Sequence, residues 1–214
     1  MSKSFKAEFV YPTEKTGFFS GEKIGSKILK DIKDTGRFNY EGWWPCFFPT
    51  TIGFLVTGSR EKHNVMTVSC MTVVNADPFM IGFPVFSQGK SPRGDGPRYS
   101  MELIQENPEF TINVPYMDKE ATKRVTICGT LSGRNGVNKI DKAGFTTIAS
   151  RHVSPPILKE CPLSLECIVH SNIPLGSHNW IIGRVETVVM DESLAKGECQ
   201  LLWRSMAELI KKGK

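Results

Sequence analysis

The sequence has none of the short motifs that identify the common hydrolytic and nucleotide-dependent active sites. H-E-x-x-H, the P-loop, a Ser/His/Asp order and a convincing pair of carboxylates are all missing, and the lack of G-x-G-x-x-G argues against a Rossmann-type fold. Its six cysteines form no C-x-x-C and no Cys/His metal pattern. Most of them lie among apolar residues, where a reduced cysteine behaves as a small hydrophobe.

Long apolar runs and clusters of like charge are missing as well. No run approaches the roughly 20 apolar residues that a membrane-spanning helix needs, so we expect no membrane partner. The N-terminal "MSKSFKAEF" has no apolar signal region, so we expect a cytoplasmic protein. The net charge is +5, but Lys and Arg are dispersed and the longest basic run is "KKGK", so we expect no nucleic-acid partner.

What the chain does contain is a series of strands from residue 50 onward. Alternating or apolar runs bounded by turn residues predict strands at 51–58, 64–74, 79–86, 109–115, 162–170 and 180–191. With few helices between them, such strands favour an antiparallel barrel or sandwich. Gly183, inside the last strand, predicts a bulge or the close approach of another backbone or a ligand.

Three segments have helical spacing. Residues 100–107 form a helix with Ser100 as its cap and Pro108 as its stop, and residues 199–214 form an amphipathic helix with lysines at its C-terminal end. A shorter helix is expected within residues 21–32. The aromatic stretch "GWWPCFFPTT" either packs in the core or belongs to a ligand site or dimer contact.

The strand at 64–74 has small polar side chains at its centre. Alternation places Thr67 and Ser69 on one face with Val65, Met71 and Val73, and leaves the other, more apolar face for the core. Buried hydroxyls need partners. Either a neighbouring strand supplies them, or a flat polar ligand does.

Two basic segments are candidate ligand contacts. Residues 87–104, "SQGKSPRGDGPRYSMELI", end in the predicted helix, whose exposed N–H groups and positive dipole end suit a phosphate, although the same pattern describes a capped helix after a solvated loop. Residues 128–145 form either a surface loop or part of a ligand site. Cys128 is given no catalytic role, and His178, alone before a strand, is more often structural.

Four stretches in this order resemble one known family: "NVMTVSCMTVVNADPFMIGF", "RYSMELIQENPEFTINVP", "CGTLSGRNGVNKIDKAGF" and "CPLSLECIVHSNIPLGSHNWIIGRVETVVMDESL". Together they resemble the flavin reductase-like FMN-binding split barrels, and within them the flavoredoxin-like branch. The resemblance covers residues 49–194. It leaves residues 1–48 as an N-terminal extension and 195–214 as a C-terminal helix.

The resemblance implies a mainly β protein, a Greek-key split β-barrel with a few peripheral helices. It also implies a homodimer with FMN near the dimer interface, where the small side chains of the 64–74 strand leave a slot for a planar ring. The implied cofactor-binding residues are Met66, Thr67, Val68 and Ser69 along the ring, Arg98, Tyr99 and Ser100 at the phosphate, and Lys90 and His178 as further contacts. The link at 87–97 is longer than the family's usual one.

The expected activity is that of an FMN-dependent oxidoreductase. It passes electrons from NAD(P)H or another donor to a second flavin, a metal complex or a protein acceptor. Flavin carries such chemistry itself, so a missing acid–base pair does not count against it. Two alternatives stay open: an FMN-binding electron-transfer protein without NAD(P)H activity, and a barrel that has lost flavin.

Overall fold

The computed structural model describes residues 9–13, 16–19, 50–88 and 96–204. The chain divides into two compact units, 50–203 and a second unit formed by 1–49 with 204–214. In the latter, β1 (Phe9–Thr13) and β2 (Thr16–Phe19) form an antiparallel hairpin. The predicted helix within 21–32, the aromatic stretch at 43–48 and Lys90 lie outside the described residues.

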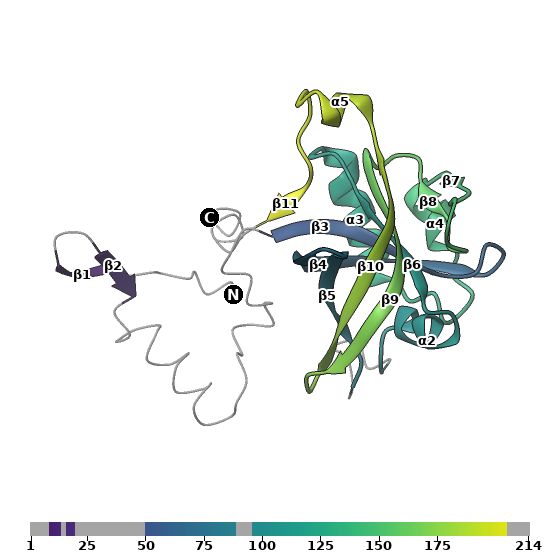
Figure 1. Ribbon diagram of the computed structural model, residues 1–214, viewed down its shortest axis with the longest axis horizontal. Coiled ribbons are helices and arrows are strands. Elements are labelled where there is room, and N and C mark those ends of the chain that lie inside the picture. Colours follow the sequence, from purple (N-terminus) through teal and green to yellow (C-terminus); the bar gives the residue numbers. More distant parts are fainter. Residues whose placement is uncertain (1–8, 14–15, 20–49, 89–95, 205–214) are drawn as a thin grey trace, which may run out of the picture. The chain divides into compact units, whose positions relative to one another are not determined.

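The larger unit is an antiparallel β-barrel (Figure 1). Its strands are β3 (Thr50–Gly58), β4 (His63–Ala76), β5 (Phe79–Phe86), β6 (Glu109–Val114), β9 (Leu163–Pro174), β10 (His178–Met190) and the short β11 (Trp203–Arg204). They run in the order β11-β3-β4-β5-β10-β9-β6, and β6 pairs back onto β3 to close the ring. A separate two-stranded sheet joins β7 (Thr147–Ile148) to β8 (Ile157–Leu158). The predicted strands and the antiparallel barrel are therefore confirmed.

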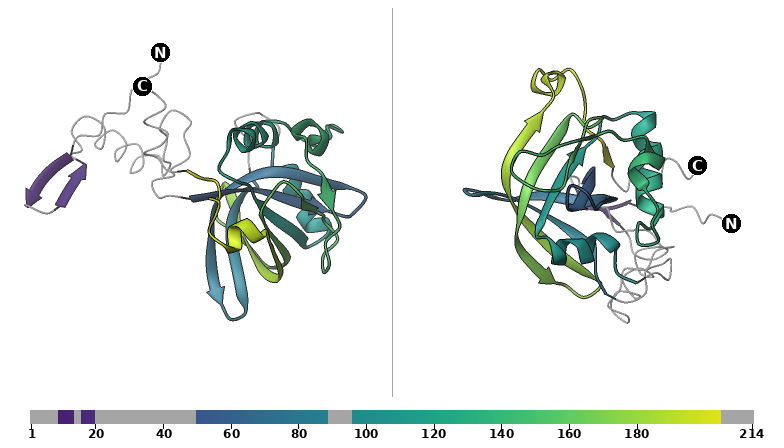
Figure 2. Two further views of the ribbon diagram at one scale, coloured as in Figure 1. Left: turned by 90° about the horizontal axis from the view of Figure 1, so that it is seen from above. Right: turned by 90° about the vertical axis from the view of Figure 1, so that its right-hand side faces the viewer.

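Both faces of the β3–β4 pair are buried. Leu55, Met66 and Val68 belong to the cluster inside the barrel, whereas Phe54 and Val65 belong to a second cluster on the outer face. That outer cluster is covered by α3 (Lys119–Thr130) and α4 (Lys139–Ala143), which stand beside β4 in the right-hand view of Figure 2. The expectation that only one face of β4 is core is wrong, because the two helices bury the other face.

A bulge interrupts β4 between Val68 and Met71, where the pairing with β3 slips by one residue. Cys70 carries it with φ +59°, a left-handed conformation that non-glycine residues seldom adopt. The predicted alternation fails at this point, because Met71 now packs against the barrel interior rather than with Thr67 and Ser69. Beyond the bulge β4 changes partner and pairs with β5 from Thr72 onward.

Gly183 on β10 lies against the side chain of Phe110, which fills the barrel interior. The pairing of β10 with β9 slips between Ile182 and Gly183, and a Cβ at Gly183 would lie 2.2 Å from Cζ of Phe110. The predicted bulge is confirmed, whereas the close neighbour at Gly183 is the side chain of Phe110 and not a backbone or a ligand. The large Phe110 ring fits in the barrel because this position has no side chain.

The predicted helix at 100–107 is α2 (Tyr99–Glu106), but its cap differs. Arg98 occupies the N-cap without a side-chain hydrogen bond, and Ser100 lies inside the first turn, where its fully buried hydroxyl bonds elsewhere. The Ser-cap prediction is therefore wrong. The remaining short helix, α5 (Glu192–Ala195), follows β10.

The predicted helix at 199–214 does not begin at Cys199. Leu201 forms a β-bridge with Tyr116 and packs against the barrel core, and Trp203–Arg204 is a strand. Hydrogen bonds from Leu202 to Pro115 and from Ile52 to Leu202 hold this segment extended. Residues 205–214 lie outside the described part. Among the described residues, no helix is long and apolar enough to cross a membrane.

Candidate functional site

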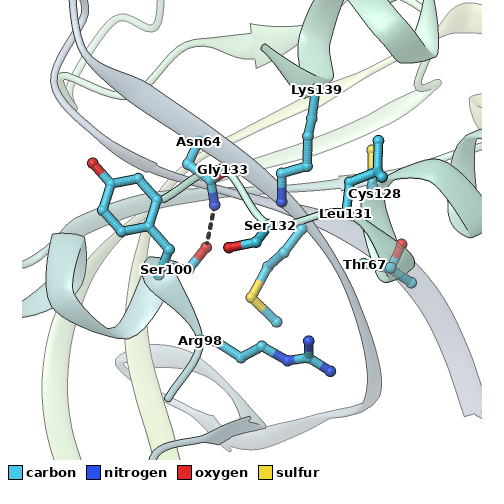
Figure 3. A pocket seen from close by; sticks show the side chains of 12 residues that line it. Asn64, Thr67, Arg98, Ser100, Cys128, Leu131, Ser132, Gly133 and Lys139 are labelled. Atoms are coloured by element: carbon cyan, nitrogen blue, oxygen red, sulfur yellow. Dashed lines mark hydrogen bonds between the residues drawn. The ribbon is translucent and has the colours of Figure 1, made fainter. Parts of the chain in front are cut away.

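A small pocket lies along the edge of the first half of β4 that no described strand covers. It is lined by Asn64, Met66, Thr67, Arg98, Tyr99, Ser100, Cys128, Gly129, Leu131, Ser132, Gly133 and Lys139. These residues come from β4, the N-terminus of α2, the C-terminal end of α3, the following loop and the start of α4. The topology thus brings three separate parts of the chain to one place (Figure 3).

Ser100 and Asn64 form the polar end of the pocket. Nδ2 of Asn64 donates to Oγ of Ser100 over 2.8 Å, and the two residues are 6% and 0% exposed. A hydroxyl that accepts a hydrogen bond still has its own proton to donate. Ser100 also lies in the first turn of α2, where backbone N–H groups have no partner within the helix. This end of the pocket is therefore built to donate hydrogen bonds.

Two cations add to this donor set. Lys139 is only 4% exposed, and its amine points into the pocket (Figure 3). Arg98 lies at the N-cap of α2, held there because its backbone N–H donates to the carbonyl of Phe86 over 3.0 Å. Hydroxyls, helix N–H groups, a lysine and an arginine are the groups that bind phosphate. No group of His, Cys, Asp and Glu in the described ranges could hold a metal ion.

Gly133 allows the chain to close around this end, whereas a side chain at Gly129 would make an ordinary contact with β4. A Cβ at Gly133 would lie 2.2 Å from Oδ1 of Asn64, so any side chain there would displace the amide that bonds Ser100. A Cβ at Gly129 would lie 3.4 Å from Oγ1 of Thr67. The backbone of 129–133 therefore lies directly against β4.

Neither the Thr67 hydroxyl nor the Cys128 thiol is available as a nucleophile. Oγ1 of Thr67 donates to the carbonyl of Val125 over 2.8 Å, so a helix, neither a neighbouring strand nor a ligand, supplies the partner of this hydroxyl. Burial raises the pKa of the Cys128 thiol to about 11, although the nearby Lys139 charge lowers it. The thiol therefore stays protonated at neutral pH and is no nucleophile, which agrees with giving Cys128 no catalytic role.

The structure brings five of the predicted cofactor-binding residues together. Met66, Thr67, Arg98, Tyr99 and Ser100 all line the pocket.

The remaining predicted residues lie elsewhere. The Val68 side chain is buried inside the barrel, so only its backbone can face the pocket side. Ser69 is half-buried at the bulge and does not line the pocket. His178 opens β10 and packs edge-on against Phe86, 5.3 Å between ring centroids. Its pKa is lowered by burial and then by the positive charge of Arg98, so it flanks Arg98 from outside the pocket.

Sequence reasoning missed Asn64, Ser132, Gly133 and Lys139 as lining residues. Three of them fall in the 128–145 segment, for which the sequence allows either a surface loop or a ligand site. Two aromatic residues of the neighbouring strands point elsewhere: Phe83 is fully buried in the barrel and Trp180 covers Gly82 on β5. Neither lines the pocket.

Comparison with known proteins gives a consistent result. The family described as Flavin reductase like domain matches residues 46–208. An uncharacterized protein of Archaeoglobus fulgidus is 32% identical over 145 residues, which is 68% of this chain and 75% of that protein. The NADH-dependent FMN reductase AsuE2 of Streptomyces nodosus subsp. asukaensis is 25% identical over 138 residues, 64% of this chain and 67% of that protein.

Among solved structures, the flavoredoxin of Desulfovibrio vulgaris (Miyazaki F) superposes with a TM-score of 0.58 at 25% identity, covering 72% of this chain and 77% of that one. The barrel described above is therefore the split barrel that the sequence predicts.

Proposed function

This chain belongs to the flavin reductase-like domain family, and on that premise we propose that it binds FMN in the pocket beside β4 and acts as an oxidoreductase. Electrons come from NAD(P)H or another donor and pass to a second flavin, a metal complex or a protein acceptor. The observation that carries the proposal is a set of donors that line that pocket together: the buried Ser100 and Lys139 and the half-buried Arg98.

The donor set fits the phosphate of FMN. Arg98 and Lys139 supply charge-assisted hydrogen bonds, which are stronger than neutral ones. The Ser100 hydroxyl adds a neutral donor that the Asn64 amide keeps aimed, since the amide fills its acceptor side. Tyr99 and Ser100 further contribute the N–H groups of the first turn of α2. We therefore add Lys139 to the residues proposed to hold the phosphate.

The edge of β4 next to this donor set fits the flavin ring. From Asn64 to Val68, β4 pairs on one side with β3, and β5 joins its other side only from Thr72. Along the described strands, this stretch therefore keeps an edge that no strand covers. Met66 and Thr67 line the pocket there, and Val68 and Ser69 would contribute backbone groups.

The residues of the site bind and orient; they are not acid–base catalysts. When bound, FMN supplies the hydride and electron transfer. Cys128 stays protonated, and the hydroxyl proton of Thr67 is committed to Val125. Backbone N–H groups at the β4 edge would stabilise negative charge that develops on the ring during reduction. The protein's contribution is a preformed polar groove, and no side chain needs to exchange a proton.

A homodimer belongs to the same proposal. The ends of β4 and β10 carry exposed apolar side chains: Val73 at 61%, Val188 at 45% and Met190 at 50%. They border an apolar groove of about 430 Å³ over the open end of the barrel. Contiguous apolar surface of this kind marks contact sites. Sedimentation at micromolar concentration should give twice the chain mass of 23.9 kDa, and a purely monomeric protein would refute the dimer.

The experiment for the proposed function has two readouts. Purified protein is titrated with FMN, followed by flavin fluorescence, and FMN-loaded protein is then mixed with NADH or NADPH in a stopped-flow instrument. Saturable FMN binding with rapid bleaching supports the oxidoreductase. Binding without bleaching supports the electron-transfer alternative. No FMN binding overturns the proposal.

A further inference from the structure

One charge in the site works against a phosphate. Glu102 lies in the first turn of α2, just after Arg98, Tyr99 and Ser100, which line the pocket. A carboxylate there favours the helix but competes with an incoming anion for the positive end of the helix dipole. The proposed FMN phosphate would therefore meet a negative charge at its own binding helix unless another group neutralises Glu102.

Arg134 is placed to do this. Its Nη2 forms an ion pair with Oε1 of Glu102 and donates to the carbonyl of Pro97 over 2.9 Å. Its guanidinium also lies 6.0 Å from the centroid of the Tyr99 ring. Arg134 therefore contacts the start of α2 at three residues: Pro97 before the cap, Tyr99 at the first helical position and Glu102 in the first turn.

Arg134 also belongs to the loop that closes the pocket. It directly follows Ser132 and Gly133, which line the pocket, and Gly133 lies against Asn64. The ion pair thus joins the 131–138 loop to α2 across the phosphate end. With side-chain exposures of 30% and 45%, the pair is partly shielded from solvent.

We propose that Arg134 is a positioning residue that neutralises Glu102 and so lets the N-terminus of α2 accept the dianionic phosphate of a flavin mononucleotide. Arg134 itself does not line the pocket. This inference rests on the proposed function, because it concerns the phosphate end of the same site. It predicts an energetic coupling between two residues outside the pocket lining and a ligand charge.

The test is a double-mutant cycle read with two ligands. Arg134→Ala, Glu102→Gln and the double variant are each titrated with FMN and with riboflavin, which has the same ring and no phosphate. Arg134→Ala should weaken FMN about fivefold to thirtyfold, the effect of a unit charge roughly 8 Å from a mono- or dianion at an effective dielectric constant of about 40. Glu102→Gln should bind FMN at least as tightly as the unsubstituted protein.

The decisive outcome is rescue. In the double variant FMN affinity should return to within about twofold of the unsubstituted protein, since both charges of the pair are gone. Riboflavin affinity should not change in any variant. If the double variant binds FMN as weakly as Arg134→Ala, or if riboflavin weakens equally, Arg134 acts only through folding and the inference is wrong.

A matched control tests whether the loss of any ion pair on the protein would weaken FMN binding. Arg184→Ala breaks a comparable pair with Glu186 on β10, where the two atoms are 2.6 Å apart, and should leave FMN affinity unchanged. Failure of the proposed function gives a different pattern. The unsubstituted protein would then bind FMN no better than riboflavin, or bind neither.

Discussion

Lys139 is the most buried charged residue of the pocket, so replacing it by Met tests whether the FMN phosphate binds there. Lys139 is the first residue of α4, and its amine points into the pocket while its stem is enclosed (Figure 3). Met has a similar unbranched stem and no charge, so the packing is largely kept. The helix start is kept too, because Oδ1 of Asn138 still accepts from the N–H of Ile140 over 3.1 Å and of Asp141 over 3.3 Å.

The magnitude follows from the bond that is lost. A hydrogen bond to a charged group contributes about 1.5–3 kcal/mol. At about 1.4 kcal/mol per factor of ten, FMN affinity should fall about tenfold to 150-fold. Riboflavin has no phosphate for Lys139 to bind, so its affinity should change by less than about twofold. The difference between the two ligands isolates the phosphate contact from any change in packing.

Fluorescence titration of FMN and riboflavin against both proteins measures this directly. Lys142→Met is the matched control, because Lys142 is exposed on the same short helix and should bind both ligands normally. If Lys139→Met binds FMN within twofold of the unsubstituted protein, the phosphate does not lie against this amine. An equal loss for riboflavin would likewise refute the assignment.

Three further results are expected. Gly133→Ala should weaken FMN by displacing the Asn64 amide, measured by the same titration, and unchanged affinity would show that this contact is dispensable. The Cys128 thiol, with its pKa raised to about 11, should react with iodoacetamide far more slowly than a free thiol at pH 7.5, and rapid labelling would contradict its burial. The pKa of His178 is lowered from 6.5, so as pH falls below about 6.5 the unfolded state takes up a proton that the folded state refuses, and stability is lost. Urea unfolding at pH 7.5 and 5.5 should show this loss in the unsubstituted protein and less of it in His178→Gln; equal losses would contradict the shift near Arg98.

The strands were predictable because each has one apolar face or a continuous apolar run between clear turns. The bulge at Cys70 was not, since nothing about a cysteine favours a left-handed backbone, and it moved Met71 to the opposite face from the predicted one. The prediction of a C-terminal helix is wrong at its start because tertiary contacts override the helical pattern. Leu201 has helical spacing with the residues after it, but pairing with Tyr116 and packing on the barrel hold it extended.

The helix α3 escaped prediction because its apolar face is narrow. Only Ala121 and Cys128 are buried on it, two turns apart, and β-branched Thr and Val residues fill much of the rest. Its start does carry a local signal, since Asp118 caps it by accepting from the N–H of Ala121 over 2.6 Å. Recognising that cap would have placed Cys128 and Gly129 at a helix end beside the next loop.

The site residues that belong to a local sequence pattern were predictable, and those brought in by the packing of distant segments were not. Arg98 and Ser100 precede or open a helix, which is a feature of the sequence itself. Lys139 follows a turn-rich stretch, where a lysine is normally solvated. Its burial arises only because α4 packs against β4, and no pattern within the segment reports that contact.

Equilibrium titration of the unsubstituted protein with FMN, riboflavin and inorganic phosphate tests the central claim most directly. The account predicts saturable FMN binding, weaker riboflavin binding by at least about tenfold, and competition by phosphate against FMN only. Equal affinity for FMN and riboflavin, or no flavin binding at all, would contradict the claim that the polar end of the β4 pocket holds a flavin phosphate.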